Sequence, residues 1–215
     1  MCSAGHALPD EAPGRRGQGE ARQPPVSTPA AAALAAYAAL LARWNGRINL
    51  VSPRDLARLG ERHVEDSAQL VPLIPPGARR VADLGSGAGF PGLVLAILTG
   101  LETHLVERDQ RKAAFLREAA RVTAAPATVH AADAASLPPL GADLVTARAL
   151  APLPALLPLA ARHLAPGGAC LFPKGASADA ELTAALPAWT MRIERFPSRT
   201  DPAATILRLT EVARA

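Results

Sequence analysis

The stretch Val81-Ala-Asp-Leu-Gly-Ser-Gly-Ala-Gly-Phe-Pro-Gly92 decides the fold of this chain. Apolar residues lead into Asp83 and Leu84, a glycine-rich run follows, and the apolar residues 93–98 come directly after it. This order predicts a buried strand, a tight turn and the start of a helix. Such a unit brings a nucleotide-like ligand against backbone N–H groups at the N-terminus of the helix.

Two ligand classes compete for the turn. Gly87-x-Gly89-x-x-Gly92 matches the dinucleotide fingerprint, and Glu107 lies 107 − 87 = 20 residues further on, where a ribose-binding acid belongs. In the other register, Asp83 ends the strand. Its carboxylate would share the helix N-terminus with a pyrophosphate, but it suits S-adenosylmethionine, which carries an ammonium, a sulfonium and no phosphate. Asp83 therefore favours a methyl donor; a glycine turn without any ligand is the remaining alternative.

Composition indicates one globular domain and leaves the partner open. The 215 residues are 49% hydrophobic but only 3% aromatic, so the core must rest on Leu, Val and Ile. The net charge is +4, and the only lysines are Lys112 and Lys174. Arginine pairs with phosphate and stacks on bases, which favours a nucleic-acid partner. Arginine use driven by a GC-rich genome explains the same balance equally well.

Neither a metal nor a membrane is indicated. Cys2 and Cys170 form no disulfide or zinc pattern. The chain has no uninterrupted apolar run of about 18 residues, and its N-terminus lacks the basic-then-apolar pattern of a signal peptide. We therefore expect a cytoplasmic protein without a metal.

Residues 1–28 are rich in Pro, Gly, Ala and Arg and almost free of large apolar side chains. Such a segment cannot bury enough surface to offset the entropy of ordering. We predict a disordered tail that methyl transfer does not need.

Residues 29–77 are predicted to form a helical extension. The first helix runs from Pro29 to about Trp44, and a second, short helix opens at Ser52. A third begins near Glu61, and its predicted buried edge consists of Val64, Ala68 and Val71. His63, Asp66 and Ser67 fall at i, i+3 and i+4 on a different edge. This polar edge either faces a cleft or is an ordinary exposed face with a His–Asp contact.

Residues 78–215 alternate between strand and helix patterns and are predicted to form one structural unit with 29–77. The strands are predicted at 80–84, 103–107, 128–130, 143–146 and 168–174, and the intervening helices at 92–98, 110–123, 152–164 and 178–186. Segments 189–196 and 205–212 form a closing antiparallel pair. Alternating βα units give a parallel sheet with helices on both faces and ligands at the carboxyl ends of the strands. The polar residues at or just beyond these ends are Asp83, Glu107, Asp133, Arg148 and Lys174.

Several specific motifs occur together and in a fixed order. They are Trp44-Asn-Gly-Arg-Ile-Asn-Leu50, Arg62-His-Val-Glu-Asp-Ser67, Asp83-Leu-Gly-Ser-Gly-Ala-Gly-Phe-Pro-Gly92, Lys112-Ala-Ala-Phe-Leu116, Thr146-Ala-Arg-Ala149, Pro166-Gly-Gly168 and Lys174-Gly175. In this order they resemble the bacterial small-subunit rRNA methyltransferase G family, also called glucose-inhibited division protein B. The resemblance covers about residues 37–175.

The resemblance implies a seven-stranded Rossmann-like α/β fold of the class I S-adenosylmethionine-dependent methyltransferases, with an N-terminal helical extension. It implies S-adenosylmethionine as donor and N7 of one guanine in the 530-loop region of 16S rRNA as acceptor, with 16S rRNA or the 30S subunit as partner and a monomeric enzyme. The expected cofactor-binding residues are Asp83, Gly85, Gly87, Phe90, Glu107, Asp133, Ala134 and Arg148. The chain departs from its relatives at Ala132-Asp133-Ala134, where many carry an Arg-x-Glu-like triplet, so adenine contacts there would come mostly from backbone.

This chemistry needs no general base, because guanine N7 carries an in-plane lone pair at neutral pH. Catalysis then rests on alignment of N7, the methyl carbon and sulfur. N7 lies in the deep major groove of A-form RNA, so the target is in a loop or is turned out of its stack. Arg148 is the first candidate on the acceptor side and Lys174 the second, with His63, Asp66 and Ser67 as substrate-side candidates. The alternatives are methylation of another RNA or a small molecule, an NAD-dependent oxidoreductase, and a non-catalytic RNA-binding module.

Overall fold

The computed structural model describes residues 27–215, except for the side chain of Glu61. Most of the predicted disordered tail lies outside the described residues. Its last two members, Ser27 and Thr28, instead begin helix α1 (Thr28–Asn45), with the Ser27 side chain accepting a hydrogen bond from the N–H of Ala30. Serine is a favoured helix N-cap, which explains why this helix begins before Pro29.

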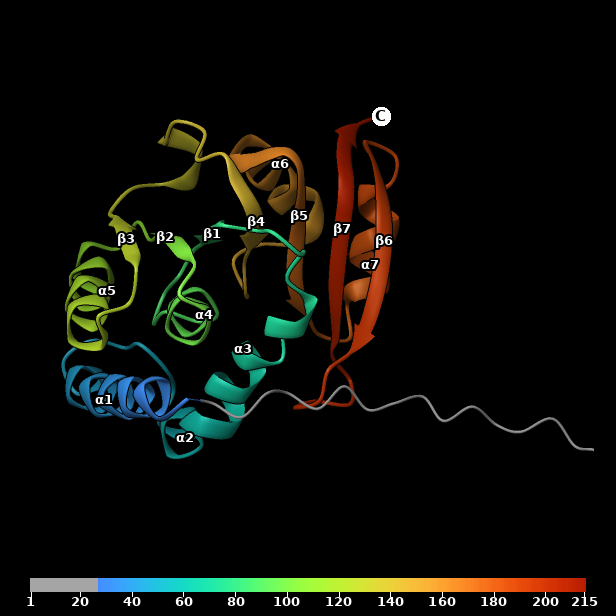
Figure 1. Ribbon diagram of the computed structural model, residues 1–215. Coiled ribbons are helices and arrows are strands. Elements are labelled where there is room, and N and C mark those ends of the chain that lie inside the picture. The colour runs from blue at the N-terminus through green and yellow to red at the C-terminus, as the bar shows by residue number, and fades with distance from the viewer. Residues whose placement is uncertain (1–26) are drawn as a thin grey trace, which may run out of the picture.

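A seven-stranded sheet organises the rest of the chain (Figure 1). Its strands are β1 (Arg80–Leu84), β2 (Glu102–Val106), β3 (Ala127–His130), β4 (Ala142–Thr146), β5 (Leu164–Lys174), β6 (Trp189–Pro197) and β7 (Thr205–Arg214). Their order is β3-β2-β1-β4-β5-β7-β6, and β7 runs antiparallel to both of its neighbours. The predicted parallel sheet with a closing antiparallel pair is confirmed.

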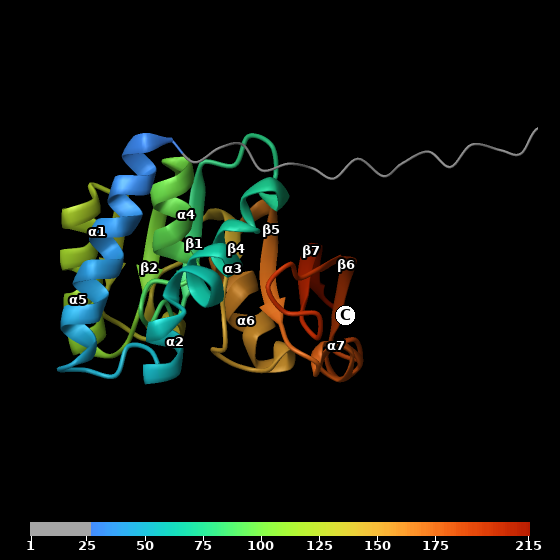
Figure 2. The ribbon, with the colours of Figure 1, turned by 90° about the horizontal axis from the view of Figure 1, so that it is seen from below.

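Helices cover both faces of the sheet. They are α2 (Pro53–Ala57), the π-helix η1 (Gly60–Glu65), α3 (Asp66–Ala68), η2 (Val71–Leu73), α4 (Gly92–Thr99), α5 (Gln110–Thr123), η3 (Ala134–Ser136), α6 (Leu153–His163) and α7 (Ala178–Ala185). In Figure 1, α1, α4 and α5 lie below the sheet and α6 lies above it. Figure 2 shows the same α1 beside α4 and α5. Among the described residues, no helix is both long and apolar enough to cross a membrane.

The core divides between these two layers. On the α1 side, Tyr37 and Leu41 pack with Leu105 and Phe115 in one apolar cluster. On the other side, the apolar residues of α6 pack against β1, β4 and β5. The helical extension thus shares a core with the sheet, and its segments η1 and α3 contact Arg148 just beyond the end of β4.

The buried edge predicted for the third helix is only partly correct, because Val64 and Val71 pack against the core without being fully buried. Val64, Ala68 and Val71 are only partly buried, whereas Ser67, Gln69 and Leu70 are buried. The cause is the π-helical turn at 60–65, because an i→i+5 turn takes up an extra residue and rotates the following side chains onto another face.

Strand β5 begins at Leu164, four residues before the predicted start at Gly168. Leu164 already pairs with Ala142, and the register then shifts before Leu144 pairs with Ala169. The intervening Ala-Pro-Gly-Gly run contains residues that are depleted in strands, so the pattern concealed an irregular beginning.

Candidate active site

The turn after β1 uses its own backbone donors. The N–H groups of Gly85 and Ser86 both donate to the carbonyl oxygen of Val106, at 2.9 and 3.0 Å. The N–H of Gly87 donates to Glu107 Oε2 at 2.9 Å. A pyrophosphate site requires such N–H groups to point at the ligand. These three are already satisfied within the protein, which disfavours a dinucleotide.

Glu107 is anchored by both of its carboxylate oxygens. Besides the bond from Gly87, Oε1 accepts the N–H of Asp109 at 2.8 Å, and the residue is only 7% exposed. Each carboxylate oxygen has a second lone pair. Glu107 is therefore held in one orientation while it can still accept hydrogen bonds from two adjacent hydroxyl groups, as a ribose presents them.

A hollow of about 520 Å³ lies over this turn, and we call it the donor pocket. Its lining includes six of the eight predicted cofactor residues: Gly85, Gly87, Glu107, Asp133, Ala134 and Arg148. Oδ1 of Asp133 accepts a hydrogen bond from the N–H of Ala135, so this carboxylate helps to shape the wall formed by η3. The volume lies within the range of small-molecule sites.

Asp83 does not line the donor pocket. It is completely buried, Oδ1 accepts the hydroxyl of Thr146 at 2.9 Å, and Oδ2 lies so close to Gly92 that an added Cβ there would approach it to 2.7 Å. Burial raises the pKa of Asp83 to about 6, although neighbouring hydrogen-bond donors oppose the shift. The carboxylate thus occupies the N-terminus of α4 itself, which still argues against a pyrophosphate at that place.

Phe90 is also outside the donor pocket lining and is 3% exposed. The ring of His63 stacks on it with centroids 4.8 Å apart, and the guanidinium carbon of Arg148 lies 5.1 Å from its centroid. Tyr37 packs nearby at 5.5 Å. Phe90 is therefore a platform that supports Arg148, and its expected contact with the cofactor stays a prediction.

Arg148 is fixed by two polar partners as well. Its Nη1 lies 2.9 Å from Nδ1 of His63 and donates to Asp66 Oδ2 at 3.2 Å. Since a guanidinium only donates, Nδ1 must accept, and the imidazole is neutral with its proton on Nε2. Burial, and then the charge of Arg148, lower the pKa of His63 to about 4, which agrees with the neutral ring.

A second hollow of about 510 Å³ begins on the other side of Arg148, and we call it the acceptor cleft. His63, Asp66 and Lys174 line it, together with residues of the β6–β7 hairpin. Both hollows share residues 148–151, which we call the partition segment. Ser67 is 1% exposed and its hydroxyl donates to the carbonyl oxygen of His63 at 2.6 Å, so it does not reach the cleft.

Lys174 holds the partition segment in place. Its Nζ donates to the carbonyl oxygen of Ala151 at 3.0 Å and to Glu181 Oε2 at 2.8 Å. The same carboxylate oxygen accepts the N–H of Leu153 at 2.8 Å, at the start of α6. Lys174 lines the cleft, but its ammonium is engaged in this clamp.

Sequence patterns missed four contributors. Leu150 is 40% exposed and packs over Gly85, where an added Cβ would meet its Cδ1 at 2.7 Å. Tyr37 donates its hydroxyl to the carbonyl oxygen of Ala88 in the turn. Glu181 and Asp201 complete the clamp and the cleft wall. Of these, only Tyr37 carried a signal in the sequence, because Leu34, Tyr37, Leu41 and Trp44 are spaced i, i+3, i+7 and i+10 and form one apolar stripe.

Known proteins resemble this chain in sequence and in fold. Ribosomal RNA small subunit methyltransferase G of Rhodospirillum centenum is 65% identical over 182 residues, covering 84% of this chain and 83% of that protein. The protein of the same name from Paramagnetospirillum magneticum is 57% identical over 178 residues, covering 83% and 87%.

Solved structures show the same fold. A predicted O-methyltransferase from Agrobacterium tumefaciens matches with a TM-score of 0.54 and 25% identity, covering 69% of this chain and 80% of that one. A putative transferase from Pyrococcus horikoshii matches with a TM-score of 0.58 and 14% identity, covering 79% and 67%.

The family model described as rRNA small subunit methyltransferase G matches residues 30–199. This range includes the donor pocket, the partition segment, the residues that hold Arg148, and the lining of the acceptor cleft except for Thr200, Asp201 and Ala204. On the strength of this match and of the identities above, the chain belongs to the rRNA small subunit methyltransferase G family and is an rRNA methyltransferase.

Proposed function

We propose that this enzyme transfers the methyl group of S-adenosylmethionine to N7 of one guanine in the 530-loop region of 16S rRNA. The observation that carries this proposal is the pair of hollows that meet at the partition segment. One hollow has the volume for a nucleoside-like donor beside Glu107, and the other, at about 510 Å³, has the volume for a base. We infer that the enzyme is monomeric and that, as an rRNA methyltransferase, it acts in the cytoplasm.

The residues of the donor pocket fit S-adenosylmethionine, which supplies an electrophilic methyl group on a sulfonium. Both oxygens of Glu107 are oriented by backbone N–H groups and face a ribose site. At Ala132 and Ala134 the lining offers only backbone polar groups and small side chains, which leaves room for a flat base. The turn bears no unsatisfied N–H at Gly85, Ser86 or Gly87 that would favour a phosphate instead.

The acceptor side suits a nucleophile that needs no base. His63 has its Nδ1 lone pair engaged by Arg148 and its Nε2 protonated, so it cannot take a proton. Asp66 is committed to Arg148 and to its hydrogen-bonded neighbours. Guanine N7 attacks through an in-plane lone pair, and what it requires is alignment with the methyl carbon. The remaining N–H donors of Arg148 can hold guanine O6 or a flanking phosphate.

A direct test uses 30S particles that lack the endogenous methyl group, incubated with labelled donor, followed by strand scission specific for N7-methylguanosine. We expect one cleavage site, in the 530-loop region. Naked 16S rRNA, tested in parallel, shows whether assembly is required. Label at another atom or in another RNA region would contradict the proposal.

The oxidoreductase alternative is tested by thermal shift. S-adenosylhomocysteine should raise the midpoint of thermal unfolding, and NAD should not, because the turn offers no free pyrophosphate donors at Gly85–Gly87. A shift with NAD alone would reverse this assignment.

A further inference from the structure

The carboxylates of the acceptor cleft are not equivalent. Asp66 is paired with Arg148, and Glu181 with Lys174. Asp201 also lines the cleft, and among the described residues no arginine, lysine or histidine forms an ion pair with it. Its Oδ1 accepts the N–H of Ala203 at 2.9 Å. Asp201 is therefore the carboxylate of this cleft that retains capacity for a ligand.

The position of Asp201 is set by a partly buried hydrogen-bond network at the tip of the β6–β7 hairpin. Gln69 is 4% exposed, and its Oε1 accepts the N–H of Arg199 at 2.8 Å. The Thr200 hydroxyl donates to Asp66 Oδ1 at 2.8 Å, and the Gln69 amide donates to the same oxygen at 2.9 Å. The carboxylate that orients Arg148 thus also holds the residue next to Asp201.

Guanine presents chemistry that matches this arrangement. Its N7 and O6 are acceptors, while N1–H and the 2-amino group on the Watson–Crick edge are donors. Arg148 can serve only the acceptors, because a guanidinium has no lone pair. A carboxylate can take both donors at once. The cleft offers one from a different segment of the chain, since Asp201 belongs to the hairpin and Arg148 to the partition segment.

The reaction itself favours a carboxylate at that edge. The N7 lone pair forms the new N–C bond, the C–S bond breaks with its electron pair going to sulfur, and the positive charge passes to the purine. No proton moves. The cationic purine is a stronger donor at N1–H and at the amino group, so hydrogen bonds to a carboxylate tighten as the transition state forms. Arg148, being positive, cannot supply this stabilisation.

We propose that Asp201 binds the Watson–Crick edge of the acceptor guanine and stabilises the positive charge that develops during methyl transfer. This inference rests on the proposed function. It makes Asp201 both a catalytic residue and the residue that distinguishes guanine from adenine, whose Watson–Crick edge lacks a donor at N1.

The test compares Asp201→Asn with Glu65→Gln in methyl transfer to 30S particles. Asparagine keeps an oxygen for the Ala203 N–H, so the hairpin should remain folded; Glu65 is an exposed acid next to Asp66 that does not line the cleft. We expect Asp201→Asn to lower kcat/KM roughly 10- to 100-fold. S-adenosylhomocysteine binding and thermal unfolding should stay as in the wild type.

The direction of the change in activity distinguishes a carboxylate that binds the guanine from one that only lies at the rim of the cleft, near the RNA. Removing a negative charge beside RNA normally strengthens binding, so a rim carboxylate predicts unchanged or higher activity, as expected for Glu65→Gln. Unchanged or higher activity of Asp201→Asn would overturn the inference. If the wild type leaves the guanine unmethylated at N7, the proposed function fails instead, and the two failures are distinguishable.

A second measurement changes the RNA and leaves the protein intact. Particles reconstituted with inosine at the target position lack only the 2-amino donor. The wild type should methylate them more slowly than guanine particles, and Asp201→Ala should show little of this difference. An equal penalty in both proteins would also contradict the assignment.

Discussion

Arg148 shows how much of this site depends on one side chain. It rests on Phe90, bonds to His63 and Asp66, and belongs to both hollows. Removing it leaves Asp66 with its other hydrogen-bond donors, so the fold should survive. Misplacing reacting groups by about 1 Å can lower rates about 100-fold.

We therefore expect Arg148→Ala to lower kcat about 100-fold. Arg148→Lys should recover little, because an ammonium cannot bridge two partners and stack in the same way. Turnover is measured on 30S particles, with circular dichroism as the check on folding. Methylation at the wild-type rate by Arg148→Ala would remove this residue from the site.

The raised pKa of Asp83 predicts how the free energy of unfolding depends on pH. Its folded pKa of about 6 lies above the unfolded value of about 3.9, so the folded protein binds the proton more tightly. Between these two values the folded state holds more protons, and the free energy of unfolding falls as pH rises. The carboxylate therefore destabilises the fold at neutral pH, and does so less below about pH 4.

The measurement compares wild type with Asp83→Asn by urea unfolding at several pH values. The wild-type free energy of unfolding, relative to that of the variant, should fall by up to about 3 kcal/mol between pH 4 and pH 7 and stay constant above. The comparison cancels titration of other groups. Parallel pH profiles for the two proteins would show that Asp83 does not titrate in this way.

The polar residues at the ends of strands could be identified from the sequence, but the directions in which their side chains point could not. A strand-end pattern places Asp83 and Glu107 at one edge of the sheet without showing that one turns into the helix N-terminus and the other into the pocket. That choice depends on Gly92, whose missing Cβ leaves space for the Asp83 carboxylate. Asp201 lies on a hairpin tip, where no periodicity carries information about a distant cleft.

At the scale of elements, the partition segment depends on a clamp between β5 and α7. Lys174 and Glu181 have side chains only 10% and 17% exposed, and together they hold Ala151 and Leu153. Breaking one partner of a buried pair leaves an uncompensated charge, which costs about 3–5 kcal/mol. Replacing both partners avoids that penalty.

We accordingly expect Lys174→Met to destabilise the protein by about 3 kcal/mol or more, and the Lys174→Met, Glu181→Gln double variant to lose less than the sum of the single changes. Glutamine can still accept the N–H of Leu153. Urea unfolding of the four proteins gives the coupling energy. Strictly additive effects would mean that the pair does not act as a clamp.

Strand and helix order was predictable because the βα alternation is strongly periodic and each unit buries its own apolar face. What escaped prediction is local backbone geometry without a sequence signal of its own. The π-helical turn at Gly60–Glu65 rotated the faces of the segment after it, bringing Gln69 inward and Ser67 away from the cleft. The early start of β5 was hidden by its Pro-Gly-Gly run.

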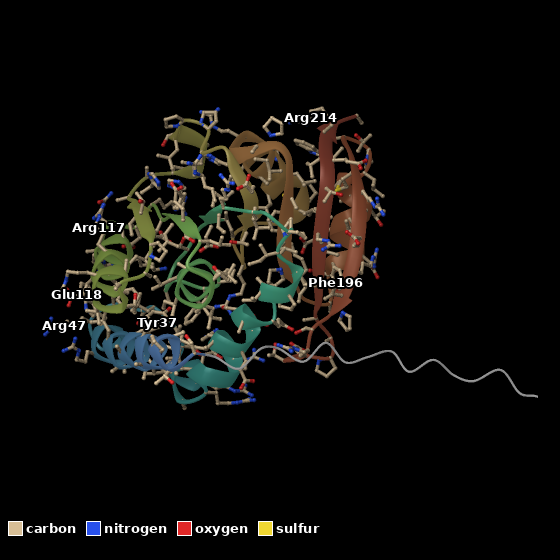
Figure 3. The ribbon with its side chains drawn as sticks, viewed as in Figure 1. Tyr37, Arg47, Arg117, Glu118, Phe196 and Arg214 are labelled. Carbon is tan, nitrogen blue, oxygen red and sulfur yellow. The ribbon has the colours of Figure 1, made fainter. Side chains whose placement is uncertain are left out.

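At the scale of the whole molecule, several of the arginines gather next to the acceptor cleft. A hollow of about 360 Å³ on the helical extension is lined by Ser52, Arg54, Asp55, Arg58 and Arg62. Arg62 lines the acceptor cleft as well, so this arginine hollow adjoins the cleft at Arg62. An RNA strand entering the cleft would pass positive charge here. Figure 3 shows Arg117 pointing outward from α5 at the far flank.

This arrangement predicts which arginines contact phosphate. Each phosphate contact to single-stranded RNA contributes about −0.7 to the slope of log affinity against log salt concentration. Replacing Arg54 and Arg62 with alanine should therefore make the slope for 30S binding shallower by about 1.4, with weaker binding at low salt. The matched control replaces Arg117 and Arg192, which are exposed on α5 and β6 and line neither the arginine hollow nor the acceptor cleft. It removes the same net charge, so a general electrostatic effect would change both variants alike, whereas a change confined to the first places the RNA backbone along the arginine hollow.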